Sequence, residues 1–178
     1  MKKASLTILL FCALSIGASS QSIYSIPLRN IDGDSVQLSD FSGKKMLFII
    51  LPLAGQDSVA GQLISFAEQH GDSITVIGVI SVEDGYTGEM KETVKTLYSG
   101  TSIILTEPMN IRKASSNQSG LMQWFTDKNK NRHFIRDADA IGMKFFVGET
   151  GRLFAVLGRG GGLQSPIIER ILGNTPEN

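Results

Sequence analysis

The thiol is the first group in this chain to consider for chemistry. The sequence contains one cysteine, Cys12, which lies in an apolar stretch near the amino terminus. A thiolate can attack a peroxide and pass through a sulfenic acid, and no other protein side chain replaces it in that cycle. Because the segment around Cys12 is expected to be removed on export, the sequence predicts a mature protein with neither a disulfide nor thiol chemistry.

Acidic and hydroxyl side chains are the next candidates. Gln56, Asp57, Glu83 and Asp84 follow two expected strands, so they could converge in a carboxylate-rich cleft that does acid–base work or holds a metal. We favour solvated loop carboxylates, and an acid-based hydrolase at Glu83 is the weakest alternative. Ser58 has no histidine nearby in sequence to activate it, so we expect Asp57 or Ser58 to be a helix N-cap.

Three further polar features give no reason to expect a cofactor. His70 and His133 are far apart in sequence, so we expect surface histidines and no zinc or other metal site. The glycine-rich segment 158–162 lacks the ordered lysine and helix start of a phosphate-binding loop, which favours a flexible turn. Residues 129–133 are expected to form a solvated polar loop.

The amino-terminal segment, residues 1–20, is typical of a signal peptide. Two lysines precede an apolar stretch over 6–18, and the small residues that follow predict cleavage before Gln21. Lipidation of Cys12 is the less favoured alternative, because bulky Phe11 precedes it. We therefore expect an exported protein, periplasmic or secreted, with no membrane insertion once the leader is cleaved.

Residues 21–178 have the size of one ordinary domain. Without the two leader lysines the chain carries 15 basic and 17 acidic residues, a net charge of −2. A nearly neutral chain with no basic cluster gives no reason to expect nucleic-acid binding. At 42% hydrophobic residues it can form a substantial core without a disulfide.

Hydrophobic periodicity predicts an α/β protein. Apolar runs over 46–53 and 74–82 are typical of strands buried on both faces of a sheet. The other expected elements are an amino-terminal hairpin (23–28 and 35–38), a short strand (102–105), a second hairpin (144–147 and 153–157), and helices from about Ser58 to Gly71 and over 87–98, 118–126 and 167–172. This order predicts a thioredoxin-like three-layer α/β/α sandwich with an N-terminal β-hairpin. The expected core residues are Leu47, Ile49, Leu51, Ile74, Val76, Ile77, Val79, Phe145, Val147 and Leu153.

The turn of the first hairpin has an alternating set of acceptors, Asn30, Asp32 and Asp34. This spacing resembles the start of a calcium loop, but the glycine and glutamate positions of an EF-hand do not follow. A hairpin turn is the preferred interpretation.

Three stretches resemble glutathione peroxidases. They are the opening (Ser22-Ile23-Tyr24, Asp32-Gly33 and 36–44), a helix segment (121–128), and Lys144-Phe145-Phe146-Val147 followed by Glu149-Thr150-Gly151. With the matching element order, the resemblance covers residues 22–172. Trp124 belongs to the helix segment and is expected to pack in the core.

The resemblance implies a site whose catalytic residues are missing. It places the family's cysteine or selenocysteine at Gly55 or within one residue of it, the catalytic glutamine at Glu83, and the tryptophan and asparagine at Ala140 and Ile141. The expectation is thus a degenerate, catalytically inactive family member with an unknown protein or small-molecule partner, used for binding or as a scaffold. The alternative is a peroxide-stress protein that acts through a partner's thiol.

Overall fold

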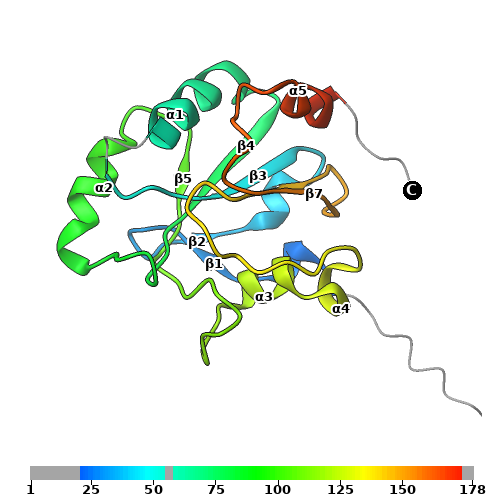
Figure 1. Cartoon of the computed structure of the whole chain (residues 1–178), viewed down its shortest axis with the longest axis horizontal. Coiled ribbons are helices and arrows are strands. Elements are labelled where there is room, and N and C mark those ends of the chain that lie inside the picture. Colours follow the sequence, from blue (N-terminus) through cyan, green and yellow to red (C-terminus); the bar gives the residue numbers. More distant parts are fainter. Residues whose placement is uncertain (1–20, 55–57, 174–178) are drawn as a thin grey trace, which may run out of the picture.

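The computed structural model describes residues 21–54 and 58–173 (Figure 1). The predicted leader with Cys12, the cleavage and lipidation alternatives, and positions 55–57 therefore lie outside the described residues. Within the two described ranges, none of the helices combines the length and hydrophobicity that crossing a membrane requires.

A mixed five-stranded sheet forms the centre of the fold, with the strand order β5-β4-β3-β6-β7. The strands are β3 (Lys45–Ile50), β4 (Ile74–Val79), β5 (Ile104–Leu105), β6 (Lys144–Val147) and β7 (Leu153–Leu157). β3, β4 and β5 run parallel, whereas β6 is antiparallel to β3 and β7 is antiparallel to β6. The apolar runs are continuous because helices cover both faces of the sheet.

The two faces of β3 contribute to two separate cores. Met46, Phe48 and Ile50 pack into one hydrophobic cluster, and Leu47 and Ile49 pack into the other. The second cluster includes α1 (Ser58–His70), α2 (Lys91–Leu97) and α5 (Pro166–Gly173), whereas the first includes α3 (Gly120–Thr126). Figure 1 shows α1 and α5 on one side of the sheet and α3 on the other. This arrangement confirms the three-layer sandwich, and all ten predicted core residues are buried.

The predicted amino-terminal hairpin is present but short. β1 (Leu28–Arg29) pairs antiparallel with β2 (Ser35–Val36). The side-chain oxygen of Asn30 accepts hydrogen bonds from the backbone N–H groups of Asp32 (3.0 Å) and Asp34 (2.8 Å), which shapes the turn between the strands.

The expected strand over 23–28 is wrong except at its last residue, Leu28. Residues Ile23–Ser25 form a 3-10 helix, η1, because the Ser22 hydroxyl accepts a hydrogen bond from the Tyr24 N–H and the Ser22 carbonyl accepts one from the Ser25 N–H. The second expected strand likewise ends at Val36 and is followed by another 3-10 helix, η2 (Leu38–Phe41). Local hydrogen bonds override the alternating pattern here, from a side chain and the backbone in η1 and from the backbone alone in η2.

Three other boundaries differ from the sequence-based expectation. The helix expected over 87–98 starts as a 3-10 turn, η3 (Gly88–Met90), before α2. Part of the predicted polar loop 129–133 is a short helix, α4 (Lys128–Asn131), because Asp127 caps it by accepting from the Asn129 N–H at 2.9 Å. α1 begins at Ser58, so Ser58 is its first helical residue and not its N-cap, and the alternative, Asp57, lies outside the described residues.

Candidate functional site

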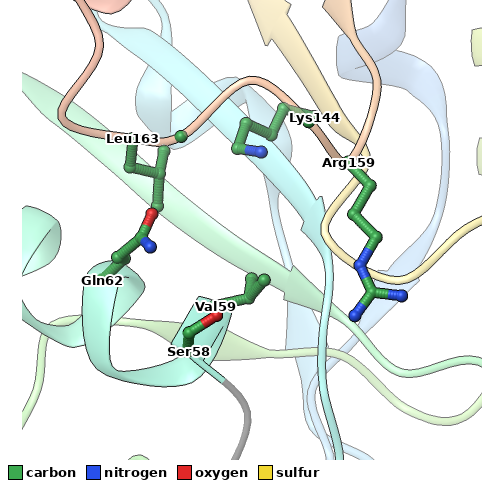
Figure 2. Close-up of a pocket in the computed structure, with 8 residues that line it drawn as sticks. Ser58, Val59, Gln62, Lys144, Arg159 and Leu163 are labelled. Carbon is green, nitrogen blue, oxygen red and sulfur yellow. The ribbon is translucent and has the colours of Figure 1, made fainter.

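A solvent-open pocket of about 380 Å³ lies beside the carboxyl end of β3 (Figure 2). Side chains from the start of α1, from the start of β6 and from the connection between β7 and α5 surround it. The lining residues are Ser58, Val59, Gln62, Lys144, Arg159, Gly160, Gly162 and Leu163. The resemblance placed the lost catalytic group on this edge of the sheet, at Gly55, which lies outside the described residues.

Backbone pairing brings the start of β6 to the end of β3. Lys144 stands opposite Ile49 in the ladder. One step further on, Ile50 donates to the Met143 carbonyl (3.0 Å) and accepts from the Gly142 N–H (2.8 Å). Residues 140–143 are consequently fixed next to the point where β3 ends.

Two of the four predicted site positions therefore precede β6 at this edge. Ala140 and Ile141 are partly buried, and Ile141 packs against the core cluster that contains α3. Neither side chain can donate or accept a hydrogen bond, so they cannot replace the indole and amide that the resemblance implies.

Lys144 is the most unusual group in the pocket. Its side chain is only 2% exposed, and its Nζ donates to the Gly142 carbonyl at 2.7 Å. Within the described part of the chain, that carbonyl is its one acceptor. Burial lowers the pKa of Lys144 to about 8, because desolvation disfavours the ammonium. At neutral pH the group is still mainly protonated and carries a buried positive charge.

Arg159 brings a second cation to the same pocket. It belongs to the glycine-rich segment 158–162, which connects β7 to α5 without forming a helix. In Figure 2 the Lys144 ammonium points toward Leu163, whereas the Arg159 side chain extends away from it, and Ser58, Val59 and Gln62 of α1 lie across from the two. No acidic side chain is among the described residues that line the pocket.

Glu83 does not line this pocket, and the expectation of a solvated loop carboxylate is wrong. Its carboxylate accepts hydrogen bonds from the backbone N–H groups of Ile111 (2.9 Å) and Arg112 (3.1 Å) and from the Ser115 hydroxyl (2.6 Å). Burial alone would raise the pKa of Glu83, but these hydrogen bonds outweigh it and lower the pKa to about 2. Glu83 is therefore a structural anchor for the segment 111–115.

The predicted carboxylate-rich cleft is not assembled by the described residues. Asp84 forms an ion pair with Arg112 at 2.8 Å, and its side chain is 11% exposed. Asp84 points to the same loop as Glu83, away from the pocket near Lys144, and Gln56 and Asp57 lie outside the described residues. The two acidic residues after β4, Glu83 and Asp84, therefore stabilise a loop and do not provide an acid–base pair to the pocket.

The histidines are separate from this pocket and from each other. His133 is exposed as predicted, and its Nε2 accepts a hydrogen bond from Arg152 Nε at 2.7 Å. Desolvation, with the nearby charge of Arg152, lowers the pKa of His133. His70 is only partly exposed, because its ring lies 4.7 Å from that of Phe66. In the region that the structure describes, no three His, Cys, Asp or Glu side chains are grouped to hold a metal ion.

Comparison with known proteins identifies the fold. No protein-family model and no curated protein sequence matches the chain. Among solved structures, Trgpx in its apo form is similar with a TM-score of 0.62 and 16% identity, over 86% of this chain and 97% of that one. T. cruzi GPX1 is similar with a TM-score of 0.63 and 14% identity, over 85% and 94% of the two chains. The chain folds like a glutathione peroxidase.

A similar fold is found in a lipoprotein thioredoxin. The exposed lipoprotein thioredoxin Etrx1 of Streptococcus pneumoniae strain TIGR4 is similar with a TM-score of 0.51 and 18% identity, over 83% of this chain and 97% of that one. At these identities the likeness concerns the fold. The chemistry of the site has to be argued from the residues that this chain places in it.

Sequence reasoning missed the two cations of the pocket. From the sequence, Lys144 is only the first residue of an expected strand, and Arg159 is only one residue of a glycine-rich turn. A lysine that opens an otherwise apolar, four-residue strand was the available signal, since lysine is almost never fully buried without a partner.

Proposed function

We propose that this protein is an exported, glutathione-peroxidase-like binding protein without peroxidase activity. The observation that carries the proposal is the composition of the pocket at the carboxyl end of β3. Its described polar side chains are the ammonium of Lys144, the guanidinium of Arg159, the amide of Gln62 and the hydroxyl of Ser58. These groups bind ligands through charge and hydrogen bonds, and none of them can be oxidised and recycled as a thiol is.

The surroundings of the pocket support the same proposal. The carboxylate at the position of the family glutamine is engaged by Ile111, Arg112 and Ser115. Ala140 and Ile141, which stand a few residues before β6 at the positions of the family's tryptophan and asparagine, have apolar side chains. A thiol introduced at this edge would therefore lack the hydrogen-bonding neighbours that the resemblance implies for activating it.

Export is supported by the leader-like segment 1–20. Cleavage before Gln21 would remove Cys12, the only thiol in the sequence. The alternative, a peroxide-stress role through the thiol of a partner protein, uses the same fold but requires the partner to supply the redox group.

Peroxide consumption by the purified protein tests the proposal. With hydrogen peroxide and either glutathione or reduced thioredoxin as donor, we expect the rate to equal that of the donor alone. Gly55→Cys is the matched variant, and we expect it to gain little, because a cysteine of ordinary pKa, about 8.5, is mostly protonated at neutral pH. An accelerated rate with glutathione as donor would contradict the proposal. An accelerated rate with thioredoxin but not with glutathione would also contradict it, and would favour the alternative in which a partner protein supplies the thiol.

A further inference from the structure

We infer that a second pocket, at the opposite end of the sheet, binds a small multivalent anion, a soluble ligand with two or more phosphate or carboxylate groups. The connection between β6 and β7 borders this pocket. It lies at the start of β3, since Val147 pairs with Met46 and the Gly43 N–H donates to the Glu149 carbonyl at 3.0 Å. The inference therefore goes beyond the proposed function and does not depend on it.

Basic side chains are concentrated in this second pocket, which has a volume of about 410 Å³. Lys130 belongs to α4, Arg132 follows that helix directly, and Arg152 belongs to the connection between β6 and β7. None of the described residues that line the pocket is acidic. The positive charge is local, because residues 21–178 as a whole carry a net charge of −2. We call this site the basic pocket.

The three cations of the basic pocket have neutral partners or none. Lys130 Nζ donates to the Gln123 side-chain oxygen at 2.6 Å, and Arg152 Nε donates to His133 Nε2 at 2.7 Å. Within the two described ranges, the Arg132 guanidinium makes no hydrogen bond or ion pair, and no carboxylate pairs with any of the three cations. Since an ammonium and a guanidinium each have several donors, all three cations can still contact an anionic ligand.

The ring of His133 shows that the positive groups lie close to one another. Desolvation lowers the pKa of this ring, and the charges of Arg152, Arg132 and Lys128 lower it further. Every charge that acts on the ring is positive, and Arg152 is in direct contact with it. The cations of α4 and of the β6–β7 connection therefore produce one positive potential, which attracts an anion into the pocket.

The backbone holds Arg132 at the basic pocket in a conformation that favours glycine. Its φ is 73°, and among the described residues other than glycine it alone has a positive φ. The buried Asn131 next to it fixes the loop, because its side chain donates to three main-chain carbonyls and accepts from two main-chain N–H groups at 2.7 to 3.1 Å. An arginine where glycine would be unstrained indicates that the guanidinium has a function.

A compact ligand with several anionic groups fits these observations. A single monovalent ion would leave most of the positive charge of Lys130, Arg132 and Arg152 uncompensated. The guanidinium groups present planar sets of donors that match phosphate and carboxylate oxygens. A volume of about 410 Å³ is at the small end of ligand pockets, which limits the size of the molecule.

Calorimetric titration with sodium pyrophosphate, at constant ionic strength and at two temperatures, tests the inference. We expect saturable binding with one site for each protein molecule, and weaker binding of sodium phosphate. Arg132→Gly removes the guanidinium and suits the positive φ, so this variant should fold and bind pyrophosphate about tenfold more weakly or worse. Absence of saturable heat at both temperatures, or equal affinity for the two anions, would overturn the inference.

A matched control separates a site from general electrostatic attraction. Arg170→Ala removes an exposed arginine of α5, which packs on the other face of the sheet from α3. This variant should bind pyrophosphate as the wild type does. Equal weakening by Arg170→Ala and Arg132→Gly would overturn the inference.

The His133 ring reports where the anion binds. The chain contains two histidines, and His133→Gln assigns the His133 signal in an NMR titration. We expect the pKa of His133 to lie below its ordinary value of 6.5 in the free protein. It should rise in saturating pyrophosphate, which remains a multivalent anion during the titration and stabilises the protonated ring. A pKa that pyrophosphate does not change would place the anion elsewhere and overturn the inference.

Anionic vesicles distinguish a soluble ligand from a lipid headgroup, which presents the same phosphate chemistry. In sedimentation with phosphatidylglycerol vesicles, we expect no binding that pyrophosphate displaces. Sedimentation with the vesicles that Arg132→Gly abolishes would show that a membrane surface occupies the basic pocket, and would overturn the assignment of a soluble ligand.

Discussion

At the scale of single residues, Lys144 carries a charge in a buried position. A lysine that is 2% exposed and has a lowered pKa lies in an unfavourable environment for its charge. Such sites are often retained for function and not for stability. The sequence alone could not reveal it, because burial of Lys144 depends on β7 and on the 158–163 connection that covers it. The role of Glu83 could not be predicted from the sequence either, because the segment that it holds, 111–115, lies about 30 residues further along the chain.

Lys144→Met should therefore stabilise the protein at neutral pH. Methionine has a similar length and removes the desolvated charge, so we expect a thermal midpoint higher by roughly 2–4 °C, which corresponds to about 1 kcal/mol for a chain of this size. Because the folded pKa of about 8 lies below the unfolded value of 10.5, the unfolded lysine holds more protons between these values. Wild-type stability then rises relative to the variant from pH 8 to pH 10.5.

Differential scanning calorimetry at several pH values measures this effect. The advantage of methionine should be largest below pH 8 and shrink toward pH 10.5. A midpoint that falls on substitution at pH 7 would show that the Lys144 ammonium has a partner that stabilises it.

At the scale of elements, buried strands are predicted well and polar segments poorly. The apolar runs of β3 and β4 were identified because an uninterrupted hydrophobic run has few alternatives in a domain of this size. The strand expected at residue 23 became η1, because the Ser22 hydroxyl and carbonyl hold the chain in a turn. α4 was missed because its start depends on one capping contact from Asp127. Local side-chain hydrogen bonds therefore account for these two errors.

Glu83→Gln should loosen the loop that follows β5. Glutamine keeps the shape but loses the charge, so the hydrogen bonds from Ile111, Arg112 and Ser115 weaken, at a cost of about 1–3 kcal/mol. The folded pKa of Glu83 is lowered from 4.5 to about 2, so its contribution is complete above pH 4.5 and is lost as the pH falls toward 2.

Urea unfolding at pH 7 and at lower pH values measures this contribution. Glu68→Gln, at an exposed position of α1, is the matched control and should leave the midpoint unchanged. An unchanged midpoint for Glu83→Gln at pH 7 would show that the carboxylate does not anchor the loop.

At the scale of the whole molecule, the element order was sufficient for the fold and insufficient for the site. Strand–helix–strand followed by a hairpin and a helix allows few arrangements, and the thioredoxin-like sandwich is the one observed. The pocket is different, because it combines residues from α1, β6 and the β7–α5 connection, which only the folded chain brings together.

The central sheet should not tolerate a charge in the core cluster that includes α1. Ile49 and Val76 are fully or almost fully buried, so Ile49→Asp or Val76→Asp should abolish cooperative unfolding, because a buried, unpaired charge costs several kcal/mol against about 5–15 kcal/mol of total stability. Circular dichroism with thermal melting tests this. A melting transition like that of the wild type would contradict the strand assignment.

Processing of the amino terminus is a separate expectation. Cleavage before Gln21 would leave Gln21 as the first residue, and its carbonyl accepts a hydrogen bond from Trp124 Nε1 at 2.7 Å. We expect the intact mass of the exported protein to match residues 21–178. A mass that includes a lipid on Cys12 would contradict the predicted cleavage site.

The ionisation of Lys144 tests the account of the pocket most directly. In protein labelled with 13C-lysine, with the Lys144 signal assigned by Lys144→Met, an NMR titration follows this side chain from neutral to alkaline pH. We predict a pKa near 8, because burial disfavours the ammonium. A pKa near the ordinary value of 10.5 would contradict a buried lysine at this edge of the sheet.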